Sequence, residues 1–168
     1  SWSPNAKSLA LTLAPNGNPD IYSINSSTGR TISRLTKGHG IDTSPAYSPD
    51  GSKIAFVSER SGGAQIFIMN ANGSNVRRLT YSGRHNTDPV FSPDGNQIAY
   101  VNRNKSFDVY VINTDGTGEQ RITQDMGDNE DPTWSPDGNY VAFSSNRTGR
   151  PHIWMSTKDG AHQVQLTR

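Results

Sequence analysis

The side chains best suited to chemistry in this sequence lie in three short segments that each end in a proline. These segments read Ile41-Asp42-Thr43-Ser44-Pro45, His85-Asn86-Thr87-Asp88-Pro89 and Asp128-Asn129-Glu130-Asp131-Pro132. They concentrate carboxylate, amide and imidazole groups, which exchange hydrogen bonds and can ligate hard cations. Two kinds of chemistry follow, namely recognition of a polar partner and binding of a cation.

The same three segments stand at matching places in an internal repeat. An aromatic residue followed by Ser-Pro occurs four times, and the serines at positions 3, 48, 92 and 135 follow one another after 45, 44 and 43 residues. Each unit carries four apolar runs of strand length, separated by turn residues. Four strands in about 43 residues is the period of a β-propeller blade.

The predicted strands recur at matching offsets within the units. Second strands are expected at 9–13, 54–58, 98–102 and 140–144, and third strands at 21–25, 66–70, 109–113 and 153–157. Fourth strands end at 35–36, 79–80, 122–123 and 166–167. The sequence therefore predicts an all-β chain, a β-propeller of four four-stranded antiparallel blades, with approximate bounds 1–36, 37–80, 81–123 and 124–168.

Turn chemistry supports these strands. The tetrapeptide Ser-Pro-Asp-Gly at 48–51, 92–95 and 135–138 has the residues of a type I turn and links first to second strands. The first unit has Asn5-Ala6-Lys7 after its Ser-Pro, so its turn is expected to be less regular.

Composition narrows the function classes. Only 31% of the residues are hydrophobic. Because stacked blades bury one another's faces, this content is enough for the chain to fold. The net charge of +1, without a basic stripe, argues against nucleic acid, and no apolar run is long enough for membrane insertion. The chain has no Cys, no HExxH motif and no GxSxG motif, so we predict that it is not an enzyme, has no catalytic residues and requires no cofactor.

The repeat resembles a known family. The pattern Asp-x-x-Pro-x-aromatic-Ser-Pro-Asp-Gly, then Ile-Ala-aromatic, then Arg-Leu-Thr, is similar to the WD40-like (PD40) repeats of TolB-like propellers, and the similarity covers all four units. Residues 83–89, 128–132 and 145–151 carry the narrower resemblance. The family has an α/β domain ahead of a six-bladed propeller, so the resemblance implies that these four blades belong to a larger parent.

The resemblance also implies a function. TolB-like proteins are periplasmic, and they bind the lipoprotein Pal in the Tol–Pal system that maintains outer-membrane integrity and supports cell division. Carried over by motif match, the expected partner-binding residues of this protein–protein interaction scaffold are Ile41, Asp42, Thr43, His85, Asn86, Asp88, Glu130 and Asp131. For Asp88 and Asp131, the competing interpretation is an Asx turn that fixes the loop before the proline.

A cation site is the second hypothesis for the same loops. If the first strands are innermost, Asp42, Asp88, Asp128 and Asp131 approach the central channel and offer Ca²⁺ the oxygen ligands it prefers. The alternative is a solvated polar channel, because no EF-hand spacing is present.

Two further alternatives stay open from the sequence. The repeat also resembles the substrate-gating propellers of tricorn-type and prolyl-oligopeptidase-type serine peptidases, and the propellers of generic cell-surface proteins. The four blades could form a small ring, pair with a second chain in an eight-bladed ring, or remain an open arc. An open arc would expose two apolar blade faces and favour self-association.

Overall fold

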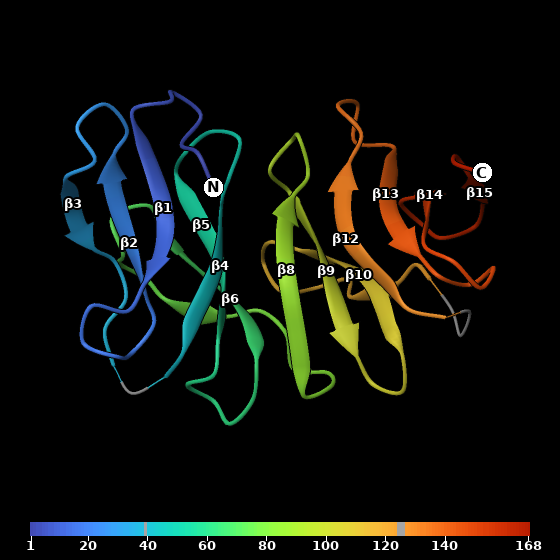
Figure 1. Cartoon of the computed structure of the whole chain (residues 1–168), viewed down its shortest axis with the longest axis horizontal. Helices are drawn as coiled ribbons and strands as arrows, with labels where there is room; N and C mark the ends of the chain where they lie inside the picture. Colours follow the sequence, from blue (N-terminus) through green and yellow to red (C-terminus); the bar gives the residue numbers. More distant parts are fainter. Residues whose placement is uncertain (39, 124–126) are drawn as a thin grey trace.

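The computed structural model describes residues 1–38, 40–123 and 127–168, and it folds the chain into four antiparallel β-sheets (Figure 1). Every element assigned in these residues is a β-strand. The described part of the chain holds no helix of the length and apolarity that crossing a membrane requires. The predicted all-β class and the predicted antiparallel blades are confirmed.

Each sheet is one blade, numbered here in chain order. Blade 1 comprises β1 (Ser8–Leu13), β2 (Asp20–Asn25) and β3 (Thr31–Arg34), and blade 2 comprises β4 (Asp42–Tyr47), β5 (Lys53–Ser58), β6 (Gln65–Asn70) and β7 (Arg77–Arg78). Blade 3 comprises β8 (His85–Phe91), β9 (Gln97–Arg103), β10 (Phe107–Asn113) and β11 (Gln120–Arg121). Blade 4 comprises β12 (Asn129–Trp134), β13 (Tyr140–Ser145), β14 (His152–Thr157) and β15 (Gln163–Gln165).

The hydrophobic core lies between the blades. One cluster joins Ala10, Ile21 and Leu35 of blade 1 to residues such as Ile54 and Phe56 of blade 2. Two further clusters join blade 2 to blade 3 and blade 3 to blade 4 in the same way. Full burial of each large apolar side chain contributes about 1.5–3 kcal/mol, so adjacent blades stabilise one another even though the chain is mostly polar.

The Ser-Pro-Asp-Gly turns owe their shape to side-chain hydrogen bonds. The Ser48 hydroxyl donates to Asp50 Oδ1 at 2.6 Å and accepts a bond from the Lys53 amide at 2.9 Å. The hydrogen bond from the Ser48 hydroxyl, followed by those from the Ser52 amide and hydroxyl, lowers the pKa of Asp50 to about 2. Gly51 completes the turn with a φ of 73°. The turn therefore fixes how the first strand of a blade meets the second.

The first unit departs from the sequence-based expectation in two ways. Its turn is regular, because the Ala6 amide donates to the Ser3 carbonyl at 2.9 Å as Gly51 does to Ser48. Ala6 adopts a φ of 56°, the left-handed conformation that the other turns fill with glycine. The irregularity lies instead in the sheet, which has three strands and only an isolated bridge between Trp2 and Leu9.

A second correction concerns the register of blade 4. Trp134 pairs with Val141, as Phe91 pairs with Ile98 in blade 3. Val141 therefore occupies the buried repeat position that the predicted strand 140–144 gave to Tyr140. Tyr140 lies one place earlier, where its side chain is partly exposed.

We expect Ala6→Gly to raise the free energy of unfolding by about 1 kcal/mol, because a left-handed conformation costs an L-residue with a side chain roughly that amount. The reverse change, Gly95→Ala, is the matched control, since an added Cβ there meets only Pro49 Cδ at 3.7 Å while φ remains 74°. It should lower stability by a similar amount. Urea denaturation measures both; a destabilising Ala6→Gly would contradict the assigned turn.

Candidate functional site

The three proline-ended segments lie at one edge of the blade row. They precede or begin β4, β8 and β12, and each of these strands lies against its neighbour. In Figure 1, β8 and β12 stand side by side and point the same way, so their first residues share an edge. We call residues 40–45, 83–89 and 127–132 together the mouth.

A β-bulge shapes each mouth segment. The strand register shifts between Thr43 and Ala46, between Thr87 and Val90, and between Glu130 and Thr133. At each bulge the residue before the proline is left-handed: φ is 51° for Ser44, 53° for Asp88 and 54° for Asp131. Asp tolerates this conformation better than most residues, so these positions have a structural reason for a short polar side chain.

The residue two places before each left-handed position is buried. Asp42 is 1% exposed, and Asn86 and Asn129 are 0% exposed. Asn86 Nδ2 donates to Gln65 Oε1 and to the Ser82 carbonyl, each at 2.9 Å, and Asn86 Oδ1 accepts from Asn102 at 2.6 Å. The sequence-based assignment of Asn86 and Asp42 to partner contact is therefore corrected, because both side chains are buried and Asn86 is enclosed between blades 2 and 3.

Arginine side chains bind the buried residue in two of the three segments. Arg60 Nη2 lies 2.8 Å from Asp42 Oδ2, and Arg147 Nη2 donates to Asn129 Oδ1 at 2.7 Å. The Arg147 guanidinium also stacks over Trp154, 4.5 Å from the ring centroid, and burial lowers its pKa. These arginines anchor the start of the first strand to the second and third strands of the same blade.

The structure does not assemble the predicted calcium ligands. Asp42 forms a salt bridge with Arg60. Asp128 Oδ1 accepts a hydrogen bond from the Phe107 amide at 3.2 Å, and Asp128 Oδ2 accepts one from Asn146 Nδ2 at 3.3 Å. Within residues 1–38, 40–123 and 127–168, no group of three or more His, Cys, Asp or Glu side chains is arranged to hold a metal ion. Asp42 and Asp128 are thus engaged in bonds within the chain.

Most of the remaining predicted residues face solvent: Ile41, His85, Asp88, Glu130 and Asp131 are exposed, and Thr43 is half-buried. The carboxylates among them, Asp88, Glu130 and Asp131, form an acidic patch. Partial burial raises the pKa of Glu130, and the neighbouring charges of Asp128, Asp131 and Asp88 raise it further. The structure therefore brings carboxylates of β8 and β12 close enough to interact.

Two arginines beside this patch were not among the site residues predicted from the sequence. Arg84 and Arg103, with Gly83 and Asn104, line a cleft of about 500 Å³ next to His85. His85 pairs with Arg103 across β8 and β9. The adjacency of Arg84 to His85 in the sequence was a signal for Arg84. Arg103 is the last residue of β9, and only the pairing of β8 with β9 places it beside His85. The mouth thus presents acidic and basic groups side by side.

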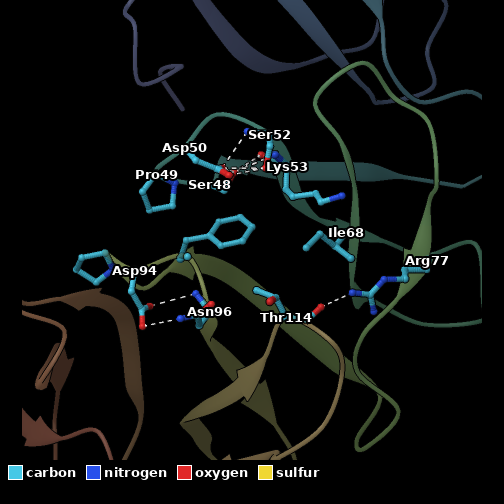
Figure 2. Close-up of a pocket in the computed structure, with 13 residues that line it drawn as sticks. Ser48, Pro49, Asp50, Ser52, Lys53, Ile68, Arg77, Asp94, Asn96 and Thr114 are labelled. Carbon is cyan, nitrogen blue, oxygen red and sulfur yellow. Dashed lines mark hydrogen bonds between the residues drawn. The ribbon is translucent and has the colours of Figure 1, made fainter.

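A second cleft, of about 510 Å³, lies between blades 2 and 3 at the Ser-Pro-Asp-Gly edge (Figure 2). Its cations have partners within the chain: Lys53 Nζ donates to Asn70 Oδ1 at 2.5 Å, and Arg77 donates to the carbonyls of Thr114 and Asp115. Figure 2 shows Arg77 directed at Thr114 across the junction. The Lys53 bond lies within blade 2 and the Arg77 bonds tie blade 2 to blade 3, so these cations serve the fold and the mouth remains the stronger candidate site.

Comparison with known proteins agrees with this architecture. The family model described as "TolB beta propeller domain" matches residues 1–109 and 102–168. A TolB homologue of Chlorobium luteolum is 44% identical over 69 residues, which cover 41% of this chain and 15% of that relative. The Tol-Pal system protein TolB of Bordetella pertussis is 47% identical over 47 residues, which cover 28% of this chain and 11% of that relative.

Solved structures extend the similarity to the whole chain. A putative TolB from Agrobacterium tumefaciens superposes with a TM-score of 0.88 at 28% identity and covers 100% of this chain, which spans 60% of that protein. A mycobacterial puromycin-hydrolyzing peptidase reaches a TM-score of 0.74 at 13% identity, which shows a common fold alone. This chain spans less than two thirds of each of these proteins.

We expect Asp42→Asn to raise the free energy of unfolding by about 1 kcal/mol. Asp42 Oδ1 is buried without a hydrogen-bond partner, at the position where Asn86 and Asn129 direct an amide donor. An asparagine would keep the Arg60 bond, as Asn129 keeps that of Arg147, and would satisfy the orphaned position.

The reverse exchange, Asn129→Asp, is the matched control. It places an acceptor against Asp108 Oδ1 and the Gly127 carbonyl, so it should cost about 1–3 kcal/mol. Chemical denaturation of both variants gives the comparison. A loss of stability in Asp42→Asn equal to that in Asn129→Asp would show that the two positions are not equivalent.

Glu130 should make stability depend on pH in a defined direction. Its folded-state pKa is raised, so the ionised form destabilises the fold above that pKa and the penalty disappears once the carboxyl is protonated in both states. We expect Glu130→Gln to be the more stable chain at neutral pH, by less than about 1 kcal/mol because the group is exposed. The difference should vanish below about pH 4. A constant difference across this range would refute the assigned cause.

Proposed function

The chain belongs to the TolB β-propeller domain family, and on this basis we propose that it is a non-enzymatic, protein-binding scaffold of a Tol–Pal-type system in the periplasm. The observation that carries the proposal is the mouth, where ionisable side chains from two blades face solvent on a rigid frame. Its partner would be a Pal-type lipoprotein, by analogy with the system named for the Bordetella relative.

Rigidity is what suits the mouth to recognition. The buried residues Asp42, Asn86 and Asn129 fix the backbone next to the exposed residues, and a bulge follows each of them. Side chains held in this way lose little entropy when a partner binds, so their contacts contribute more to affinity. We infer that Ile41, Thr43, His85, Asp88, Glu130 and Asp131 form the contact surface.

Charge would set the orientation of the partner. Asp88, Glu130 and Asp131 form an acidic side, and Arg84 and Arg103 form a basic border. A surface divided in this way accepts a segment whose charges alternate in the complementary order and repels the reversed arrangement. Binding should therefore weaken with added salt, since exposed ion pairs are screened.

The test is a calorimetric titration of this chain with a purified Pal periplasmic domain. We expect Glu130→Gln and His85→Ala each to weaken binding by about tenfold, equivalent to about 1.4 kcal/mol. Asp88→Asn removes the charge but keeps a residue that tolerates the left-handed backbone, so it separates contact from loop structure. Asp137→Asn, in an exposed turn at the far end of β12, is the control and should bind normally.

Binding that is unchanged in all three mouth variants would remove the mouth as the site. No binding by the folded wild-type chain would remove the Pal-type partner itself. Parallel titrations with calcium and with a chelator test the cation hypothesis. We expect equal affinities, because Asp42 is paired with Arg60 and Asp128 accepts the Phe107 amide, so both are engaged within the chain.

A further inference from the structure

One buried side chain of blade 2, that of Gln65, holds the mouth segment of blade 3 on both sides of His85. Gln65 is the first residue of β6 and is 3% exposed. Its amide nitrogen donates to the Gly83 carbonyl at 3.1 Å, and its Oε1 accepts from Asn86 Nδ2 at 2.9 Å. The backbone amide of Asn86 also donates to the carbonyl of Ala64, the neighbour of Gln65 in the chain, at 2.9 Å. His85 therefore lies in a span whose two ends are fixed by one side chain of another blade.

In blades 1 and 3 the position of Gln65 holds an aspartate, Asp20 or Asp108, which also precedes the residue whose amide bonds to a threonine hydroxyl. Each aspartate forms a salt bridge with an arginine of the last strand of its own blade, with N–O distances of 2.5 Å to Arg34 and 2.6 Å to Arg121. An ionised carboxylate accepts hydrogen bonds but has no proton to donate. The amide of Gln65 is therefore what permits the bond to the mouth segment.

The exchange of aspartate for glutamine also changes what the arginine of blade 2 contacts. Arg78 is the equivalent of Arg34, since each donates to the carbonyl of the threonine two residues later. In place of a carboxylate at the β6 position, Arg78 contacts the ring of Tyr81, with its guanidinium carbon 4.6 Å from the ring centroid. Tyr81 is 72% exposed and lies two residues before Gly83. The place of the Arg78 side chain therefore reports whether residue 65 is charged.

We propose that Gln65 is a positioning residue of the mouth, whose neutral amide sets where Arg84 and His85 project. The inference deepens the proposed function and rests on it for the link to a partner. Gln65 is buried, whereas Arg84 and His85 are exposed, so Gln65 acts on a partner only through the segment that it holds. Without the bond to the Gly83 carbonyl this segment has more conformations, and ordering it again on binding costs affinity.

Gln65→Asp tests the inference, because it gives blade 2 the residue that blades 1 and 3 carry, with Arg78 and Thr80 present as its partners. We expect the fold to be retained, and a thermal melt verifies this. Nuclear magnetic resonance should show the Arg78 side-chain protons leaving the shielding of the Tyr81 ring. The Asn86 amide should exchange with solvent at least about tenfold faster. Gln65→Glu, which keeps the side-chain length and replaces only the donor, is the second variant and should behave alike.

Titration with the Pal periplasmic domain connects this position to binding. We expect Gln65→Asp to bind about tenfold more weakly than the wild type, although His85 itself is unchanged. Gln97→Asp is the matched control, because Gln97 begins β9 at the other end of the strand from Arg103 and donates to Asn113 at 3.2 Å. It carries the same change of charge without touching the mouth, so it should bind normally.

The two measurements separate this inference from the proposed function. Asn86 exchange and Arg84 and His85 signals that stay at their wild-type values in both Gln65 variants would overturn the inference. A displaced segment that keeps full affinity for the Pal domain would overturn it as well. If the wild-type chain does not bind the Pal domain, the proposed partner fails, whereas displacement of the segment in the variants still supports Gln65 as the residue that positions it.

Discussion

The structure depends on a buried threonine at the end of each of the first three blades. Thr36, Thr80 and Thr123 accept backbone amides of β2, β6 and β10 at 2.9 Å, from Ile21, Ile66 and Val109 respectively. In blade 2, Thr80 also donates to Gln65 at 2.8 Å, and Asn86 of blade 3 reaches both groups. One hydroxyl therefore links the last two strands of a blade to the first strand of the next. Leaving its partners unpaired would cost about 1–3 kcal/mol for each buried group.

This link is also what positions the mouth. The buried Asn86 comes two residues before Asp88 and one residue after His85, so the network that joins the blades also sets the backbone from which both exposed side chains project. The β-bulge then turns the chain back into the ladder before Phe91. Stability and recognition share one element, and the exposed residues can vary without disturbing the junction that holds them.

The sequence predicts the features of this molecule that repeat, but not those that depend on which way a side chain points. The four-stranded blades 2 to 4 and their turn type could be predicted because Ser-Pro-Asp-Gly and the apolar runs repeat, whereas blade 1 has three strands and not the predicted four. The burial of Asn86 could not, because alternate residues of a strand face opposite sides and the bulge interrupts that alternation within the motif itself. The regular turn at Ala6 was missed for a different reason: the hydrogen bonds of Ser3 outweigh a strain that residue preference alone would avoid.

Comparison of the repeats shows that different residues fill the same buried hydrogen-bonding position in different blades. The position before the bulge pairs as Asp42 with Arg60, as Asn86 with Asn102, and as Asn129 with Arg147. An arginine serves both the aspartate and one of the asparagines, so what is preserved is a filled hydrogen-bonding site and not a residue type or a charge. The aspartate version alone leaves a buried oxygen without a partner. An acidic residue in such a motif is therefore no evidence of a ligand until its neighbours in the repeat are known, and this is why the mouth's function rests on its exposed carboxylates and not on its most enclosed one.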